Sequence, residues 1–446
     1  MCGVYNIIED ETERGDNLPE IIHKVLKEKE GSYYTIGFTV PKNVVKITVS
    51  YDYHRGTKGF MSDLHPTNTI DIGLEDADGR FLGWSGSAHK SIYVGEFGST
   101  RGYLSEPIMP GEWKIIVGAY HVAGESVEVK YSIDFEYRKE LLLFGDLHIH
   151  SDASDGRFDI HTLGKMAQKA KLDFIGIANH NNFAENFNLP NIDGLTFIKA
   201  VEWTHYNGHI NFFGVAAPFE NSFISNSFEE TEKLIADAKK LGALISVNHP
   251  KCRFCPYKWD NYDCFDMMEI WNGPMRPSNL DAIKLWTDLL KQGKRIPIVG
   301  GSDYHRPHSL ARLGNPVTAV YAQSRKAEDI LTSLREGRSF VTSSVDGVRL
   351  KLEYGKAVMG EEAVFIPGEK LRITAENMKT TSLFIVTDKY EKKLCAPSSG
   401  KLTLNQELDS DVRFAYIKAV RGIGKFSAIC AVTNPIYFNQ NKEELN

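Results

Sequence analysis

The stretch Gly145-Asp146-Leu147-His148-Ile149-His150-Ser151-Asp152-Ala153-Ser154-Asp155-Gly156 decides how this sequence is interpreted. It follows the apolar run 141–144, which predicts a buried strand, and side chains two residues apart on a strand point to the same face. His148 and His150 are therefore expected side by side at the carboxyl end of that strand, with Asp155 in the following loop. Two imidazoles and a carboxylate in this arrangement are typical metal ligands.

A lone His-x-His pair also occurs as hydrogen-bonded core residues, so the metal interpretation depends on further ligand types elsewhere. Such residues recur beside other apolar runs of the sequence. They are His180 after 174–178, Glu202 after 196–201, His209 just before 210–215, His249 after 243–247, and Asp303 and His305 after 296–302. Polar ligand types at the ends of several expected strands favour the metal interpretation.

The segments between these runs have helical character. Apolar residues recur every three or four positions in the ranges 159–171, 227–241, 279–292 and 327–335. The second of these ranges begins with a capping box formed by Ser227 and Glu230. Strands alternating with helices predict an α/β fold with a parallel sheet covered by helices. In βα barrels the carboxyl ends of the strands share one rim, so these ligands are expected to converge there.

These residues, in this order, resemble the metal motifs of the PHP superfamily, named for polymerase and histidinol phosphatase. The matching motifs are His148-x-His150, Ser154-Asp155-Gly156, His180, Glu202, His209, His249-Pro250 and Gly301-Ser302-Asp303-x-His305. Two further stretches, Glu269-Ile270-Trp271-Asn272-Gly273 and Thr433-Asn434-Pro435-Ile436-Tyr437, resemble the carbaryl-hydrolase (CehA/McbA-like) branch. The resemblance covers residues 141 to about 345 strongly and the carboxyl-terminal segment loosely.

The resemblance implies a distorted (β/α)7 barrel with a trinuclear site for divalent zinc, manganese or iron. The implied ligands are His148, His150, Glu202 and Asp303 for one ion, Asp155, His180 and His305 for a second, and His209 and His249, with Glu202 bridging, for the third. Asp303, His305 and Glu202 are also the candidate catalytic residues. In one departure, Ala178-Asn179 replaces the Thr-Asp that commonly precedes the histidine matching His180, so a change in ligand orientation is expected rather than loss of the site.

Clustered divalent ions lower the pKa of a bridging water and neutralise charge on a phosphoryl or carbonyl oxygen, which predicts hydrolysis by a metal-bound hydroxide. Lys251, Arg253 and Arg306 closely follow ligand positions and favour an anionic phosphate ester, although solvated loop charges are the alternative. Trp203 and Asn272 are candidate substrate contacts, with packing as the alternative.

Three functions are therefore considered. The first is a phosphoesterase that acts on a small-molecule phosphate mono- or diester. The second is hydrolysis of a carbamate, carboxylic ester or amide by the same cluster. The third, of another class, is a non-catalytic glycan- or protein-binding module on the same scaffold. A degenerate scaffold should have lost at least one of the nine ligands, and none is missing.

The composition narrows the class of protein. The chain has 446 residues, of which 42% are hydrophobic and 25% charged, as in ordinary globular proteins with two or three domains. A net charge of -6 and the lack of an extended basic stretch argue against nucleic-acid binding. The amino terminus does not resemble a signal peptide and no apolar run approaches about 18 residues, so a cytoplasmic protein without a membrane span is expected.

Six cysteines are few for this length and are expected to be mostly reduced. Cys252-x-x-Cys255, with Cys264 nearby, allows a structural zinc or redox interpretation. A fourth ligand at regular spacing and a thioredoxin-like context are both missing. Loop thiols beside the active site are the alternative.

The composition changes on both sides of the barrel segment. Three domains are predicted: residues 1–139, a helix over 7–29 followed by a β-sandwich; residues 140–345, the metallohydrolase barrel; and residues 346–446, a second β-sandwich. The two β-sandwiches are predicted from short β-rich runs that are separated by Gly, Pro, Asp and Asn turns. Both sandwiches are expected to flank and shield the mouth of the barrel.

Overall fold

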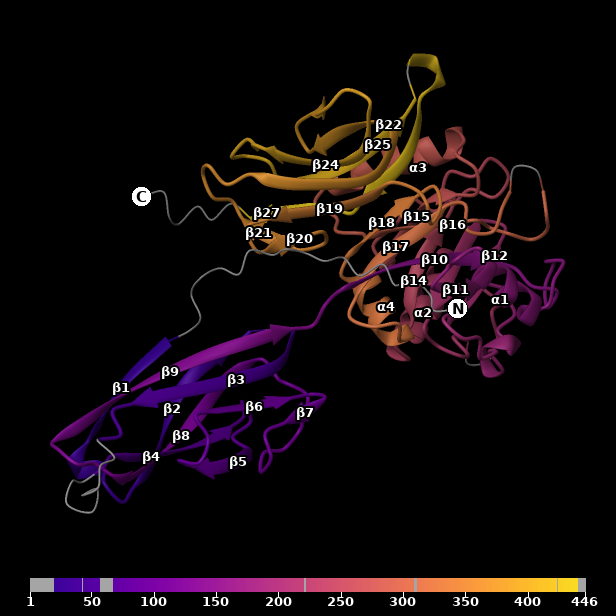
Figure 1. Ribbon diagram of the computed structural model, residues 1–446. Helices are drawn as coiled ribbons and strands as arrows, with labels where there is room; N and C mark the ends of the chain where they lie inside the picture. The colour runs from indigo at the N-terminus through magenta and orange to yellow at the C-terminus, as the bar shows by residue number, and fades with distance from the viewer. Residues whose placement is uncertain are drawn as a thin grey trace. The chain divides into compact units, whose positions relative to one another are not determined.

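A computed structural model of the protein describes residues 20–41, 43–56, 67–219, 222–308, 311–422 and 424–439. Over these residues the chain is a mixed α/β protein with many strands and four α-helices. It divides into two compact units, residues 20–139 and residues 140–439 (Figure 1). None of the described helices is long and apolar enough to cross a membrane.

The first unit consists of two antiparallel sheets around one core. One sheet has the order β1 (Glu20–Leu26), β9 (Ser126–Tyr137), β3 (Val44–Tyr53), β6 (Ser91–Gly95) and β7 (Gly98–Ser99). The other has the order β2 (Tyr33–Val40), β8 (Gly111–His121), β4 (Thr69–Glu75) and β5 (Phe81–Gly86). Alternate side chains, among them Ile47, Val49, Ile115 and Val117, point into the core and are fully buried.

The helix predicted for residues 7–29 is wrong over the part that the structure describes. Residues 20–26 form β1, which pairs antiparallel with β9, and only Lys27–Lys29 form a short 3-10 turn. Ile21 and Val25 satisfy a helical spacing, but they also fit the alternation of a strand, and the partner strand decides between the two. Residues 7–19 lie outside the described part of the chain.

The second unit contains the strands that carry the predicted ligands. In chain order they are β10 (Leu141–Ile149), β11 (Phe174–Ile177), β12 (Thr196–His205), β13 (Gly208–Phe213), β14 (Leu244–Asn248), β15 (Met267–Asn272) and β16 (Ile298–Gly301). Each pairs with the next. After β16, backbone hydrogen bonds between Tyr304 and residues 148 and 150 return the chain to β10.

The expected parallel pairing holds for most of these strands but not for β13. This strand runs antiparallel to both β12 and β14. Only Tyr206 and Asn207 connect β12 to β13, and a two-residue connection permits a hairpin but not a parallel crossover. The hairpin carries Glu202 on one strand and His209 on the other, so both ligands lie within strands rather than just outside them.

Four α-helices match the predicted helical ranges to within a few residues: α1 (Ile160–Lys169), α2 (Phe228–Lys240), α3 (Pro277–Lys291) and α4 (Ala327–Arg335). Ser227 caps α2 by accepting a hydrogen bond from the backbone N–H of Glu230 at 3.2 Å. The Glu230 carboxylate in turn accepts from the backbone N–H of Asn226 at 2.7 Å, one residue before the position that a capping box predicts.

The carboxyl-terminal segment continues the same network of strands. β17 (Val317–Ala322) pairs antiparallel with β10 and with β18 (Ser339–Thr342), which pairs antiparallel with β26 (Ala428–Thr433). The other strands of this segment are β19 (Arg349–Tyr354), β20 (Ala357–Val358), β21 (Glu362–Val364), β22 (Leu371–Thr387), β23 (Glu391–Lys393), β24 (Ser398–Gln406), β25 (Phe414–Arg421) and β27 (Ile436–Asn439). A domain boundary at residues 345–346 stays a prediction, since β18 and β26 pair across it.

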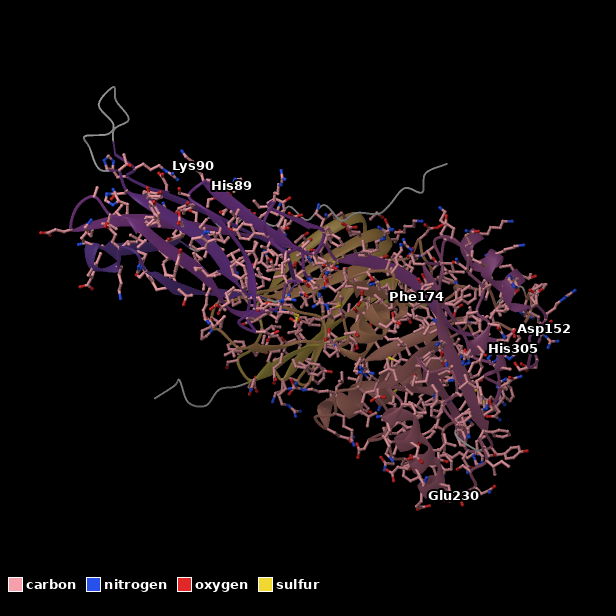
Figure 2. All side chains as sticks on the ribbon, turned by 90° about the horizontal axis from the view of Figure 1, so that it is seen from below. His89, Lys90, Asp152, Phe174, Glu230 and His305 are labelled. Atoms are coloured by element: carbon pink, nitrogen blue, oxygen red, sulfur yellow. The ribbon has the colours of Figure 1, made fainter. Side chains whose placement is uncertain are left out.

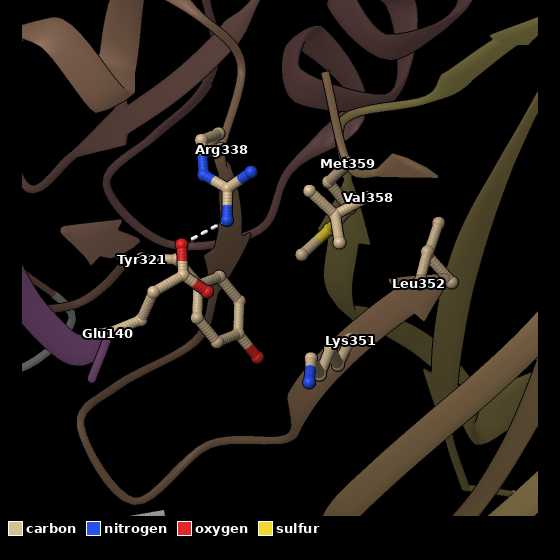
Figure 3. A pocket seen from close by; sticks show the side chains of 7 residues that line it. All are labelled: Glu140, Tyr321, Arg338, Lys351, Leu352, Val358 and Met359. Atoms are coloured by element: carbon tan, nitrogen blue, oxygen red, sulfur yellow. Dashed lines mark hydrogen bonds and ion pairs between the residues drawn. The ribbon is translucent and has the colours of Figure 1, made fainter. Parts of the chain in front are cut away.

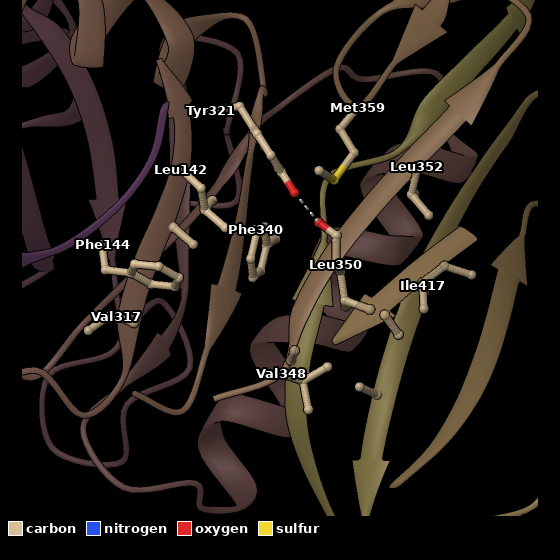
Figure 4. Close-up of a cluster of buried hydrophobic side chains, with 14 of the residues drawn as sticks. Leu142, Phe144, Val317, Tyr321, Phe340, Val348, Leu350, Leu352, Met359 and Ile417 are labelled. Carbon is tan, nitrogen blue, oxygen red and sulfur yellow. Dashed lines mark hydrogen bonds between the residues drawn. The ribbon is translucent and has the colours of Figure 1, made fainter. Parts of the chain in front are cut away.

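Among the buried apolar clusters of the second unit, one joins side chains of β10 and β18 to side chains of β19 and β25. Phe144 and Phe340 face Leu350 and Ile417 in this cluster, and the Tyr321 hydroxyl donates to the Leu350 carbonyl at 3.1 Å (Figure 4). Fully burying a large apolar side chain contributes about 1.5–3 kcal/mol. This shared core therefore stabilises the packing of residues 140–345 against residues 346–439.

A small cavity lies beside this cluster, away from the predicted ligands. Its lining comes from β17, β19, β20 and the residues next to β10, β18 and β20, and the Arg338 guanidinium pairs there with the Glu140 carboxylate (Figure 3). The remaining lining residues are Tyr321, Lys351, Leu352, Val358 and Met359. None of the nine predicted metal ligands lines it.

Candidate metal centre

The structure brings all nine predicted ligands together in the second unit. They lie on strands β10, β12 and β13 or in the loops that follow β10, β11, β14 and β16; His305, in the last of these loops, is labelled in Figure 2. The nine are His148, His150, Asp155, His180, Glu202, His209, His249, Asp303 and His305. Residues separated by more than 150 positions in the chain thus meet at one place.

Glu202 is the centre of the cluster. Its side chain is fully buried, and five histidine nitrogens surround its two carboxylate oxygens. The distances are 3.2 Å from Oε1 to His148 Nε2, 3.1 Å to His209 Nδ1 and 3.4 Å to His249 Nε2, and 2.9 Å from Oε2 to His180 Nδ1 and 3.6 Å to His150 Nε2. One carboxylate therefore faces ligand atoms from four other segments.

The potential ligands form overlapping groups in which the donor atoms lie within 4.8 Å of one another. The groups are His148, His150 and Asp303; His150, Asp155, His180 and His305; His148, Glu202 and His249; His180, Glu202 and His209; and His209, His249 and Cys255. His150 belongs to two groups, although the resemblance assigns it to one ion. Cys255 is a candidate that the sequence did not place among the ligands.

The donor set fits divalent ions. His148 Nε2, His150 Nε2 and Glu202 Oε2 are buried and have no hydrogen-bond partner among the described residues. His150 Nε2 lies 3.1 Å from Asp303 Oδ1, yet the pair does not have hydrogen-bonding geometry. Buried polar atoms are nearly always hydrogen-bonded, so atoms that approach without bonding to one another indicate a shared partner. Imidazole and carboxylate donors suit zinc, manganese and iron.

The charges in the cluster favour cation binding. Burial alone would raise the pKa of Glu202 and Asp303, but the neighbouring histidines hold the pKa of both carboxyl groups well below the usual range. Burial lowers the pKa of His150, which favours the neutral ring that a metal needs. At His148 burial opposes protonation, but the carboxylates of Glu269, Glu202 and Asp303 outweigh it and raise its pKa.

A second buried carboxylate, Glu269 of β15, orients two of the ligands. Its Oε1 lies 3.0 Å from His148 Nδ1, and its Oε2 accepts from the His249 backbone N–H at 3.0 Å and from the Asn272 amide at 3.1 Å. A carboxylate on the second nitrogen of a ligating histidine fixes the tautomer and the ring orientation. The sequence analysis named Glu269 only as part of the motif 269–273 and gave it no role. A carboxylate inside a mostly apolar strand could have indicated that role.

Asp146 is a further residue that the sequence did not single out. Its buried carboxylate accepts backbone N–H bonds from Ser302 at 2.9 Å, from His148 at 3.3 Å and from Gly314 at 2.8 Å. Burial raises the pKa of Asp146 to about 6, although these donors oppose the increase. The side chain ties β10 to the loop that carries Asp303.

Two motif glycines are required by close approach. A Cβ at Gly156 would lie 2.1 Å from the His150 carbonyl oxygen, and one at Gly301 would lie 2.5 Å from His148 Cβ.

The ligands His249 and Asp303 adopt positive φ angles of 28° and 52°, which L-residues rarely do. Such backbone strain costs about 1–3 kcal/mol per residue and is typical of functional sites.

Asn179, the residue that departs from the expected pattern, supports the loop before Asp155. Its Oδ1 accepts from the Ser151 backbone N–H at 2.8 Å and from the Ser154 hydroxyl at 2.9 Å. Its amide donates to the Glu185 carboxylate at 2.8 Å. Asn179 therefore stays outside the ligand set, and Glu185 supplies a carboxylate next to it.

Polar residues around the ligands differ in their contacts. Asn272 is buried and its amide lies 3.3 Å from Asp303 Oδ2, while Arg276 donates to Asn272 Oδ1 at 2.7 Å. Arg306 is exposed and donates to the Asp155 carbonyl at 3.3 Å. Lys251 and Arg253 are exposed. Arg276 was not among the predicted contacts.

Trp203 is involved in packing. It is 1% exposed, its indole N–H donates to the Phe223 carbonyl at 2.7 Å, and its ring stacks on His205 at 5.0 Å. On a strand, neighbouring residues point to opposite faces, so Trp203 faces away from Glu202. Of its two interpretations, packing describes the contacts that the structure shows.

Comparisons with known proteins give remote structural similarity only. No family model matches the sequence, and no curated protein matches it. A solved two-domain protein containing a predicted PHP-like metal-dependent phosphoesterase, from Bacteroides vulgatus ATCC 8482, is similar over 66% of this chain and 95% of its own, with 15% identity and a TM-score of 0.38. The lesion-specific endonuclease PfuEndoQ from Pyrococcus furiosus has 19% identity over 44% of this chain and 56% of its own, with a TM-score of 0.34.

PsfC from Pseudomonas syringae PB-5123 has 15% identity over 44% of this chain and 89% of its own, with a TM-score of 0.36. At these identities and TM-scores, functional inference rests on the side chains of the site itself.

Proposed function

We propose that the protein is a metal-dependent hydrolase of the PHP superfamily, in the carbaryl-hydrolase-like branch, that cleaves a phosphate ester. The observation that carries the proposal is the buried Glu202 carboxylate among five histidine nitrogens, since several of these buried atoms have no hydrogen-bond partner within the described part of the chain. We further propose that β10 to β16 form a distorted (β/α)7 barrel, which is preceded and followed along the sequence by a β-sandwich domain.

The proposed site holds three divalent ions. Each ion takes its ligands from several loops or strands, and Glu202 joins the sets. The ligand sets that the resemblance implies are His148, His150, Glu202 and Asp303; Asp155, His180 and His305; and His209, His249 and Glu202. Each set shares at least two residues with a group of neighbouring donor atoms. Asp155 has a 53% exposed side chain, so the second set lies closest to solvent and to an entering substrate.

Bound divalent ions would activate a water molecule and neutralise charge on the ester oxygen. Asn272 holds Asp303 Oδ2 at 3.3 Å, which leaves this carboxylate oriented to accept a proton from the attacking water at Oδ2. The Asp303 carbonyl lies 2.9 Å from His305 Nδ1, so His305 Nε2 is free to face Asp155 at 3.3 Å.

Cationic side chains around the ligands support an anionic substrate. Arg306 lies at the Asp155 carbonyl, and Arg276 is linked to Asp303 through Asn272. Guanidinium groups bind phosphate oxygens in a two-pronged geometry, so Arg306 and Arg276 are proposed to hold a phosphoryl group. Lys251 and Arg253 are exposed in the loop that follows His249 and would add positive charge near this ligand.

The test combines metal analysis with a panel of substrates. The protein, His148→Ala, Asp303→Ala and the control His161→Ala are compared for metal content and for hydrolysis of p-nitrophenyl phosphate, bis-p-nitrophenyl phosphate, aryl acetates and aryl carbamates. We expect phosphate hydrolysis that both ligand variants abolish. His161 is exposed on α1, so its variant should keep activity. A clear carbamate preference with no phosphate turnover would contradict the proposed substrate, and full activity of either ligand variant would contradict the site.

A further inference from the structure

Two cysteine thiols lie in the loop that begins at the metal ligand His249. The sulfur atoms of Cys252 and Cys255 are 3.1 Å apart, and both side chains are half-buried. The Cys252 backbone N–H donates to the His249 carbonyl at 2.8 Å, and the Tyr257 N–H donates to the Pro250 carbonyl at 3.0 Å. These bonds hold the loop in a tight turn, so the two thiols remain in contact.

The thiol of Cys255 also reaches the ligand itself. Its sulfur lies 3.6 Å from His249 Nδ1, while His249 Nε2 faces Glu202 Oε1 at 3.4 Å. When Nε2 binds an ion, Nδ1 keeps its proton and can donate it to an acceptor. Cys255 is therefore the side-chain partner that fixes the rotation of the His249 ring, while the backbone of His249 is held separately by Glu269 at 3.0 Å.

We propose that Cys252 and Cys255 form a reversible disulfide, and that this modification weakens metal binding at His249. The oxidant is a peroxide. One thiol reacts with hydrogen peroxide to give a sulfenic acid and water, and the second thiol displaces another water as the S–S bond forms. The two thiols lose two electrons and the O–O bond is reduced. A low-molecular-weight thiol restores the pair by thiol–disulfide exchange.

The geometry requires little movement of the loop. A disulfide has an S–S distance of about 2.05 Å, so the sulfurs, now 3.1 Å apart, must approach by about 1 Å. Phe254, between the two cysteines, is 89% exposed, which leaves this loop open to a small oxidant.

The consequence for the metal follows from the contact with His249. Drawing the Cys255 sulfur toward Cys252 removes the acceptor from Nδ1 and frees the ring to rotate. Loss of such an outer partner of a ligating histidine typically lowers metal affinity about 10–100-fold. The coupling rests on the proposed metal centre, whereas formation of the disulfide does not.

The experiment uses the full-length protein with zinc as the probe. Peptide mass spectrometry follows the Cys252–Cys255 cross-link after hydrogen peroxide and again after dithiothreitol, and competition with a chromophoric chelator gives the zinc affinity. We expect a cross-link that forms and reverses together with a 10–100-fold loss of affinity for one zinc ion. Cys252→Ser cannot form the cross-link, so it should bind zinc normally and its zinc affinity should not change with peroxide. Cys255→Ala, which has no acceptor for His249 Nδ1, should bind zinc weakly before and after peroxide.

Cys395→Ser is the matched control, because the Cys395 sulfur accepts a bond from the Leu383 N–H at 3.4 Å, away from the ligands; it should behave as the unmodified protein. Absence of the cross-link would overturn the modification. A complete cross-link with unchanged zinc affinity would overturn the coupling. If the reduced protein binds no zinc, the proposed function fails and the coupling with it, while the cross-link is still read by mass. A sulfur-to-cobalt absorption band after cobalt substitution would show that Cys255 is itself a ligand and would overturn its positioning role.

Discussion

The substitution Glu269→Gln tests whether the carboxylate that contacts His148 and His249 determines how tightly the site binds metal. The substitution Glu269→Gln keeps the size of this side chain, which is 2% exposed, but replaces one carboxylate oxygen with an amide N–H₂. In the protein the carboxylate faces His148 Nδ1 at 3.0 Å, the His249 N–H at 3.0 Å and the Asn272 amide at 3.1 Å. The new amide can satisfy one side of this arrangement only, because a donor must then face a donor on the other.

The expected magnitude follows from these contacts. Changing an outer carboxylate partner of a ligating histidine lowers metal affinity about 10–100-fold, which corresponds to about 1.4–2.8 kcal/mol. A buried donor left unpaired costs about 1–3 kcal/mol of folding free energy as well. We therefore expect Glu269→Gln to bind zinc 10–100-fold more weakly and to unfold at a lower denaturant concentration.

Zinc affinity is measured by chelator competition, and urea unfolding of the metal-free protein is followed by circular dichroism. Glu128→Gln, an exposed site on β9, is the control and should change neither quantity. If Glu269→Gln folds normally and binds zinc as tightly as the unmodified protein, Glu269 does not orient the ligands and the reasoning is refuted.

Three further predictions concern the same centre. Asp146→Ala leaves three buried backbone donors without an acceptor, so the free energy of unfolding should fall by at least about 3 kcal/mol in urea titrations; unchanged stability would show that water replaces the carboxylate. Gly301→Ala places a methyl group 2.5 Å from His148 Cβ, and metal analysis should show reduced occupancy; full occupancy would mean that the strands separate at no cost. Removing divalent ions with a chelator should lower the melting temperature, since a ligand at 100 times its dissociation constant stabilises a fold by about 2.7 kcal/mol; a melting temperature insensitive to chelator would contradict metal binding by the folded state.

The elements around the site could be predicted because their signals are local. The helical spacing in 227–241 and its capping residue Ser227 lie within a few positions of each other, and α2 forms there. The residue types after each apolar run are also local, so His180 and His249 could be identified without knowing which strands pair. Where two periods fitted equally well, as in β1, the contact with a distant strand decided the outcome.

The residues that hold the ligands in place, Glu269 and Asp146, could not be predicted in this way, because their contacts join positions far apart in the chain. Glu269 lies 121 positions from His148, and Asp146 lies 168 positions from Gly314. A carboxylate near an apolar strand can be a surface charge, a ligand or an anchor, and only its partners distinguish these roles. The same applies to Trp203, whose position beside Glu202 suggested a substrate contact and whose face of the strand places it in the packing.

The position of Glu202 predicts that the candidate ligands depend on one another. It lies on the hairpin strand β12, and its oxygens face histidines that come from β10, from β13 and from the loops after β11 and β14. Without a cation, a buried carboxylate needs protonated histidines around it to offset its charge, and every bound ion takes over that role. Metal binding and the packing of these four segments are therefore expected to be one cooperative event, in which loss of Glu202 disturbs every ligand set that it joins.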